Sequence, residues 1–496
     1  MEAALATTPS AKKHAMALFS RQSSPPPSPA LPPTATPTAP AAGAVAPAAA
    51  SDGRSIPRGH PGWIVAASLA TGVLAALLLV FAPFVAVTTT AITGAVLCGF
   101  ALGWATLLGL SYRFTDQPQR WAAAPALFMG VGGLLLWAFS GSQDVLKWIW
   151  PSALLALVVW MAVRVHRDLR SRAGRVQLYA VFTILALCAV GGAWQTLAQA
   201  GESNPFLTSG QLVTVDGHQL RLQCTGTGSP TVILEGGAGA TSADMGWVAP
   251  AVASQTRTCV YDRAGRGGSQ PGATAQDGAQ IATDLHTLIH KANVPGPYVL
   301  AGHSFGGLYV RIFAEHYPDE IAGLALLDST ASSQPAKSVV PAPDSTSSDT
   351  IGRAATLASL TVPVGIARLY GALIGDSGLP AHDEDQLAYD TTQANTVRSV
   401  ADEYMRGGAA AQEAASLRDF GDKPLYVLTA GSGNDQSWMA DQDKSASLST
   451  NSVHRVVDGS DHQGLLQEKQ YAARTSRAVL DVVTAVRNDQ PLTASR

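Results

Sequence analysis

The 496-residue sequence predicts two parts of different fold class: an α-helical transmembrane bundle, followed by an α/β domain with a mostly parallel sheet. Two observations carry this prediction. Residues 62–200 are mostly apolar in long runs, and from about residue 207 short strand-like runs alternate with helical segments and glycine-rich turns. Such alternation is typical of a parallel sheet with helices on both faces.

The first 60 residues precede both parts and consist largely of Ala, Pro, Thr and Ser. They have too few large apolar side chains to bury, and their prolines favour extended, solvated chain. No short apolar core with a cleavage site lies near Met1, so the segment does not resemble a secretory signal. We expect residues 1–60 to be a disordered tail.

Residues 61–200 contain about five apolar segments, each a candidate membrane-spanning helix. The fourth segment is the shortest and relies on tryptophans near its ends. Because none of the five apolar cores contains Asp, Glu, Lys, Arg or His, coupled ion transport has little support. We expect the helices to be an anchor or a surface for a partner in the lipid. The segments are residues 63–87, 89–110, 121–139, 148–163 and 176–198.

Positive charges between these segments predict their orientation. The tail carries five Lys or Arg residues, the loop at 111–120 two arginines, and the loop at 164–175 five arginines. The loop near residue 88 has none, and the loop at 140–147 has one lysine. Loops rich in Lys and Arg face the cytoplasm. We therefore expect a cytoplasmic N-terminus and, after five crossings, an extracytoplasmic position for everything that follows Ala200.

Charge and cysteine content exclude some classes of function. The net charge is +3 for residues 1–60, +5 for residues 61–200 and −11 for residues 201–496. An acidic soluble part argues against nucleic acid as a partner, because phosphate binding needs a basic surface. The four cysteines lie at no metal-ligand spacing and form no C-x-x-C, so we expect no metal and no cofactor.

The strand and helix pattern of the second part covers residues 207–488. The pair Asp216-Gly217 separates two strand-like runs and predicts a hairpin. Residues 330–422 interrupt the alternation with a Ser/Pro-rich linker and helical patches, which we interpret as an inserted cap. The expected strands are 212–215, 219–224, 231–234, 257–261, 298–301, 321–327, 423–429 and 452–457, with helices near 276–292 and 470–486.

The stretch Tyr298–Ala314 contains the motif that suggests chemistry. An apolar strand-like run leads into Gly302-His303-Ser304-Phe305-Gly306, and an amphipathic helical run follows. A G-x-S-x-G turn between a strand and a helix exposes the serine hydroxyl on a sharp turn. The backbone N–H of Phe305 would then point towards an oxyanion at the reacting carbonyl. A glycine-rich turn that only closes a buried strand is the alternative interpretation.

Three features together resemble the α/β-hydrolase family over about residues 207–488. They are the Gly302–Gly306 turn, the glycine-rich turn after Leu234, and the Asp262…Gly265-x-Gly267-x-Ser269 loop. The resemblance implies that the N–H of Gly237 is the second donor to the oxyanion. Many members have His-Gly where this chain has Glu235-Gly236, a departure that a backbone donor tolerates.

The family order of nucleophile, acid and histidine assigns the other catalytic residues. His462 follows the last strand, where the family has its base, whereas His316, His382 and His454 lie elsewhere. Two candidates remain for the acid. Asp328 ends the strand after the nucleophile helix, and Asp435 follows the next strand. We favour Asp328 and keep Asp435 as the alternative.

The same resemblance bears on the cysteines. Family members have the strand that holds Cys224 beside the strand that holds Cys259, and the predicted side of the membrane is oxidising. A disulfide between these two residues is therefore a hypothesis, with two free buried thiols as its alternative.

Together, these expectations predict that the protein is a membrane-anchored serine hydrolase that acts on an ester or related acyl substrate in the extracytoplasmic space. Because its expected nucleophile is a serine, this chain differs from relatives whose nucleophile is a carboxylate. Acyl transfer and peptide cleavage stay open as alternative reactions of the same catalytic residues. The substrate is expected to be a small or lipid-like acyl compound, with membrane lipid as the neighbouring partner. The alternative from a different class is a membrane sensor whose hydrolase-like domain only binds a ligand.

Overall fold

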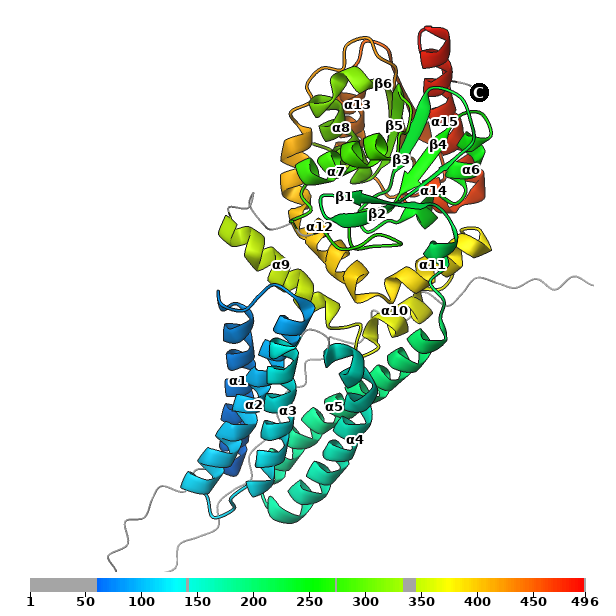
Figure 1. Ribbon diagram of the computed structural model, residues 1–496. Coiled ribbons are helices and arrows are strands. Elements are labelled where there is room, and N and C mark those ends of the chain that lie inside the picture. Colours follow the sequence, from blue (N-terminus) through cyan, green and yellow to red (C-terminus); the bar gives the residue numbers. More distant parts are fainter. Residues whose placement is uncertain (1–59, 140–141, 273, 333–344, 495–496) are drawn as a thin grey trace, which may run out of the picture. The chain divides into compact units, whose positions relative to one another are not determined.

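The computed structural model describes residues 60–139, 142–272, 274–332 and 345–494 (Figure 1). Apart from His60, the predicted tail at residues 1–60 lies outside the described residues. Within these described residues, five long helices come first, and a sheet with flanking helices follows. The prediction of apolar helices before an α/β domain is confirmed.

Each of the five helical segments is long and apolar enough to cross a membrane. The prediction that the fourth segment is short, at residues 148–163, is wrong. That helix has 27 residues, because it extends beyond the apolar run on both sides, through Asp144 and Lys147 before it and through Arg164 and Arg167 after it. The bounds are α1 Pro61–Val80, α2 Thr89–Phe114, η1 Arg120–Ala122 with α3 Ala123–Ala138, α4 Ser142–Asp168 and α5 Arg172–Gly201.

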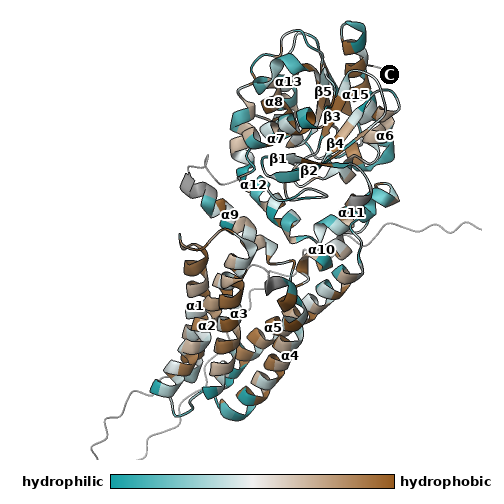
Figure 2. Cartoon of the chain, in the orientation of Figure 1, coloured by the Kyte–Doolittle hydropathy of each residue, from teal (hydrophilic) through white to brown (hydrophobic). Residues whose placement is uncertain are grey.

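The helices pack on one another through small residues and aromatic rings. A Cβ on Gly103 of α2 would lie 2.8 Å from the Cα of Gly72 of α1, so these backbones approach as closely as glycine allows. The rings of Trp104, Trp121 and Phe182 contact one another in the interior. Large apolar side chains also cover the outer surfaces of the helices, which is expected for lipid contact (Figure 2).

The described residues of the second part form an eight-stranded sheet with the order β1-β2-β4-β3-β5-β6-β7-β8. The β1–β2 and β2–β4 pairs are antiparallel, and every other pair is parallel. The predicted mostly parallel sheet is therefore confirmed. The strands are β1 Gln211–Val215, β2 His218–Thr225, β3 Thr231–Glu235, β4 Thr258–Tyr261, β5 Tyr298–His303, β6 Ile321–Leu327, β7 Leu425–Ala430 and β8 Ser452–Val457.

Helices cover both faces of this sheet (Figure 1). One face packs on α7 (Gly278–Lys291), α8 (Gly306–His316) and part of α12 (Ala394–Ala414). The other face packs on α6 (Val248–Ala253) and α15 (Lys469–Asn488). Because both faces are covered, the central strands are buried along their whole length, and their sequences are continuous apolar runs.

Four helices lie in the chain between β6 and β7, in the region predicted to be a cap. Ala410, Ala411 and Ala414 of α12 are part of the main core, so the C-terminal half of this helix belongs to the domain itself. The helices are α9 Ser345–Ser359, α10 Ile366–Ile374, α11 Ala381–Thr391 and α12. The remaining short elements are η2 Pro205–Thr208, η3 Ser242–Met245, η4 Pro318–Glu320, α13 Gln436–Ala446 and α14 Gly464–Gln467.

A disulfide joins Cys224 to Cys259 across the antiparallel β2–β4 pair. The two residues are directly opposite each other in the strand register. The free cysteines among the described residues are Cys98 and Cys188, both in the helical part. The bond therefore ties the antiparallel hairpin to the parallel part of the sheet.

We expect alkylation of the unfolded protein to modify two cysteines before reduction and four after it, as measured by intact mass. Replacing Cys224 and Cys259 by Ser should lower the free energy of unfolding by about 2–4 kcal/mol, because the unfolded chain loses a constraint. Replacing Cys98 and Cys188 by Ser is the matched control. Equal masses before and after reduction would contradict the bond.

Candidate active site

Four parallel strands bring the candidate residues to one edge of the sheet. His303 pairs with Leu327, and Leu327 pairs with Leu428, so β5, β6 and β7 end side by side. Ser304 and Asp328 are the next residues after their strands, and His462 follows β8. Ligands and reactions of open parallel sheets occur at this carboxyl edge.

Ser304 occupies the turn between β5 and α8 in a left-handed backbone conformation, with φ of 55°. A non-glycine residue in this region is strained, and such strain concentrates at functional sites. The two glycines of this turn, Gly302 and Gly306, are required because a side chain at either position would collide with the backbone. A Cβ on Gly302 would lie 2.4 Å from the carbonyl oxygen of Gly306, and a Cβ on Gly306 would lie 2.3 Å from that of Glu235.

His462 contacts Asp328 through its Nδ1, which lies 2.6 Å from Oδ2 of the carboxylate. Asp328 is fully buried and also has a left-handed backbone, with φ of 44°. Its Oδ1 accepts hydrogen bonds from Trp438 Nε1 at 2.9 Å, from Asn434 Nδ2 at 3.2 Å and from the backbone N–H of Ala430 at 3.2 Å. Both oxygens of the carboxylate therefore accept hydrogen bonds.

These donors keep Asp328 ionised. Burial alone would raise the pKa of this carboxyl, but the hydrogen bonds from His462 and Trp438 outweigh burial, and the pKa is lowered. A carboxylate accepts only, so His462 Nδ1 must donate. In the neutral imidazole, Nε2 then carries the lone pair and can accept a proton.

His303, the residue before Ser304, supports the imidazole from a second side. Its Nε2 donates to the carbonyl oxygen of His462 at 2.9 Å, and the two ring centroids are 4.5 Å apart. Burial, together with the neighbouring His462, lowers the pKa of His303 to about 3. His303 is therefore neutral at physiological pH and does not repel a proton that arrives on His462.

The second acid candidate, Asp435, has a different role in the structure. It is the N-cap of α13, and its Oδ1 accepts from the backbone N–H of Trp438 at 2.9 Å and from Ser437 Oγ at 2.6 Å. The structure thus brings His462 to Asp328, while Asp435 caps a helix. Of the other histidines, His454 contacts Thr429 and Asp443.

The turn after β3 borders the serine. A Cβ on Gly237 would lie 2.9 Å from the Cβ of Ser304, so only glycine fits there. Within the described residues, the backbone N–H groups of Gly237 and Phe305 donate to no protein acceptor. Phe305 also directly precedes the first turn of α8, where the helix dipole favours negative charge.

A buried charge network holds this turn. Arg263 donates to the carbonyl oxygens of Gly236 at 2.8 Å and Gly237 at 2.5 Å, and it also pairs with Glu235. The C=O of Gly236 and the N–H of Gly237 belong to one trans peptide and point in opposite directions, so the N–H of Gly237 faces away from Arg263. Glu235, which stands where many family members have histidine, thus pairs with Arg263 and helps to orient it.

Glu403 of α12 completes the network from the other side of the turn. Its carboxylate lies 3.0 Å from Arg263 Nη2 and 2.7 Å from Arg266 Nη1, and it accepts from the N–H of Gly239 at 2.8 Å. Burial alone would raise the pKa of Glu403, but Arg263 and Arg266 outweigh burial and lower it. The turn is thus tied to the last helix of the insertion.

Sequence reasoning missed several residues that complete this site. Arg263 and Arg266 lie in the loop that carried the family resemblance, but their partner Glu403 lies about 140 residues further along the chain, and no local pattern predicts that pairing. Trp438 and Asn434 follow β7, close to the rejected acid candidate. The missed residues are Arg263, Arg266, His303, Glu403, Asn434 and Trp438.

The arrangement combines a hydroxyl on a strained turn, an imidazole with a free nitrogen, a buried carboxylate and two unpaired N–H donors. Such a set can carry nucleophilic acyl transfer. The described side chains at this edge show no group of metal ligands within reach of one another.

The comparisons with known proteins agree with this architecture. Residues 230–468 match a family profile described as the alpha/beta hydrolase fold. An uncharacterised protein of Schizosaccharomyces pombe is 28% identical over 302 residues, which cover 52% of this chain and 53% of that protein. The chain thus spans about half the length of this relative. An uncharacterised vacuolar membrane protein of Saccharomyces cerevisiae is 34% identical over 74 residues, 15% of this chain and 12% of that protein.

Solved structures with a similar fold include an epoxide hydrolase, CorEH, at 20% identity and a TM-score of 0.42, covering 54% of this chain and 96% of that one. A thermophilic esterase from Thermogutta terrifontis has 21% identity and a TM-score of 0.43, covering 56% and 99%. The family profile and the strand order lead to one conclusion. The C-terminal part of this chain is an α/β-hydrolase domain, preceded by five helices apolar enough to span a membrane.

Proposed function

We propose that this protein is a membrane-anchored serine hydrolase that cleaves an ester or related acyl bond. The observation that carries the proposal is the 2.6 Å contact between His462 and the buried Asp328, with His462 also held by His303, the residue before Ser304 on its strained turn. Ser304 is the nucleophile, His462 the base and Asp328 the acid that orients it. The N–H groups of Gly237 and Phe305 hold the oxyanion.

The reaction follows from these roles. Nε2 of His462 removes the proton of Ser304 Oγ as this oxygen attacks the acyl carbonyl. Asp328 stabilises the resulting imidazolium, and the two N–H groups stabilise the negative oxygen of the tetrahedral intermediate. His462 then gives its proton to the leaving alcohol oxygen, and the acyl group remains on Ser304. A water molecule, deprotonated in the same way, releases the acid and restores Ser304.

The exposed side chains of the cap region favour a lipid-like substrate. Helix α10 exposes four large apolar side chains at the helical spacing i, i+3, i+4 and i+7: Ile366, Leu369, Tyr370 and Leu373. On another face of this helix, Arg368 pairs with Glu202, the residue that follows the last apolar helix α5. An amphipathic helix of this kind is typical of a segment that lies in the membrane interface.

We also propose that the hydrolase domain faces the extracytoplasmic space. Arg113 and Arg120, which flank the connection between α2 and α3, and the five arginines between Arg164 and Arg175, where α4 connects to α5, support this orientation through the positive-inside rule. The disulfide between Cys224 and Cys259 supports it independently, because disulfides persist in oxidising compartments.

Replacing Asp328 by Asn should lower kcat for p-nitrophenyl esters by about 10⁴-fold, because the amide can hold His462 in the wrong tautomer. Asp435→Asn is the matched control. Asn caps a helix nearly as well as Asp, so its kcat should remain close to that of the wild type. Equal losses in the two variants, or a larger loss in Asp435→Asn, would contradict the assignment of the acid.

Replacing Glu403 by Gln should lower kcat more than it changes KM, because the turn that carries Gly237 loses its anchor on α12. The variant also leaves the buried charges of Arg263 and Arg266 without the carboxylate of Glu403, which lowers the free energy of unfolding by about 3–5 kcal/mol. Glu413→Gln is the control on the same helix, since Glu413 also accepts a backbone N–H, that of Ala279. If both variants affect kcat alike, the proposed positioning role is wrong.

The orientation predicts which single cysteines a membrane-impermeant maleimide reaches in intact cells. In a chain with Cys98 and Cys188 replaced by Ser, Ser416→Cys should be labelled directly. Asp116→Cys, in the loop after α2, should be labelled only after the membrane is permeabilised. Both positions are exposed in the structure, so access differs only through the membrane. The reverse pattern would place the hydrolase domain in the cytoplasm.

A further inference from the structure

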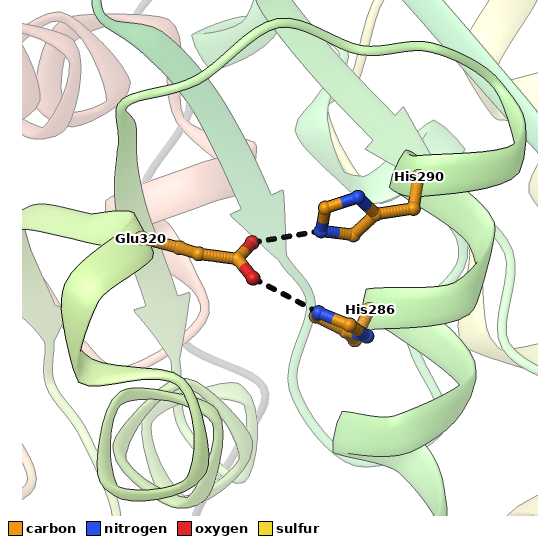
Figure 3. A group of neighbouring side chains, drawn as sticks. All are labelled: His286, His290 and Glu320. Carbon is orange, nitrogen blue, oxygen red and sulfur yellow. Dashed lines mark hydrogen bonds and ion pairs between the residues drawn. The ribbon is translucent and has the colours of Figure 1, made fainter.

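A group of potential metal ligands lies on the surface of the hydrolase domain, apart from the site of Ser304 (Figure 3). His286 and His290 project from the same face of α7, four residues apart, and Glu320 ends the short helix η4. Nε2 of His286 lies 2.9 Å from one carboxylate oxygen of Glu320, and Nε2 of His290 lies 3.0 Å from the other.

The neighbouring residues fix the orientation of these side chains. The ring of His286 stacks on Tyr317, with centroids 3.8 Å apart and planes within 7° of parallel. The backbone N–H of Glu320 donates to the carbonyl oxygen of Tyr317 at 3.2 Å, so the same residue holds the main chain of Glu320. The ring of His286 and the backbone that carries the carboxylate are therefore held in place before any ligand binds.

The spacing of the three groups fits a divalent transition metal. Zn²⁺ binds imidazole nitrogen and carboxylate oxygen at about 2.0–2.2 Å, so ligand atoms in a tetrahedral site are roughly 3.3–3.5 Å apart. Each nitrogen–oxygen pair, one on either oxygen of Glu320, is within a few tenths of an ångström of this separation. The three ligand atoms already lie within 4.8 Å of one another.

We propose that His286, His290 and Glu320 form a binding site for a divalent transition-metal ion of the zinc class. The side chains of His286 and Glu320 are 27% and 29% exposed, and that of His290 is 53% exposed. An ion can therefore enter from solvent, and water completes its coordination. Imidazole with carboxylate favours such an ion over Mg²⁺ or Ca²⁺, which prefer oxygen ligands alone.

The site has a structural role. Glu320 immediately precedes β6, and Asp328 immediately follows it. A strand of this length spans roughly 25 Å at about 3.3 Å per residue. The ion therefore binds at the opposite edge of the sheet from Ser304 and takes no part in acyl transfer. It ties α7 to the start of β6, which stabilises the folded state in proportion to its occupancy.

The test is Zn²⁺ titration by calorimetry of the full-length protein in detergent, purified without a polyhistidine tag. We expect saturable binding to this site and a rise in the unfolding temperature with Zn²⁺. His290→Ala and Glu320→Gln should each weaken binding by about tenfold or more, since even residues behind the ligands cost about 10–100-fold. His454→Ala, which removes a histidine paired with one carboxylate, is the matched control and should bind as the wild type does.

Two results would overturn the proposal. One is the absence of saturable Zn²⁺ binding, which would mean that Glu320 only forms ion pairs with the two histidines. The other is unchanged affinity in both His290→Ala and Glu320→Gln. Because these side chains are partly exposed, the variants are expected to fold, and their unfolding temperatures without metal verify this.

Discussion

The contact between His462 and Asp328 is the interaction on which the rest of the site depends. It joins the loop after β8 to the end of β6, while Trp438 and Asn434 add donors from the segment after β7. A buried carboxylate is costly unless it is fully hydrogen-bonded. Three segments that are distant in sequence must therefore come together before Asp328 can remain ionised, and this same requirement fixes the tautomer of His462.

A second constraint acts on the other side of Ser304. The turn with Gly237 has no regular structure of its own, and a network of Glu235, Arg263, Arg266 and Glu403 holds it. Since Glu403 comes from α12, the geometry of the oxyanion donors depends on the insertion that also carries the apolar face of α10. The turn beside Ser304 is therefore connected, through Glu403 and α12, to the same insertion as the exposed apolar side chains of α10.

The sequence was sufficient for the fold and for part of the site. The strands of the sheet were predictable because strands buried on both faces are continuous apolar runs, and the turn at Ser304 was predictable because its glycines are adjacent in sequence. The partners of Asp328 and Arg263 were not predictable, because they depend on contacts between distant segments. The group at His286, His290 and Glu320 was also missed, since its carboxylate comes from a different element than its histidines.

The most direct measurement of the central claim is labelling of membranes by a fluorophosphonate probe, followed by mass spectrometry of the labelled peptide. The probe should modify Ser304 in the wild type, and Ser304→Ala and His462→Gln should abolish the modification, because only an activated serine reacts. If a folded, membrane-inserted wild type is not labelled, or is labelled at another serine, the hydrolase assignment is contradicted and the domain is better explained as a ligand-binding module.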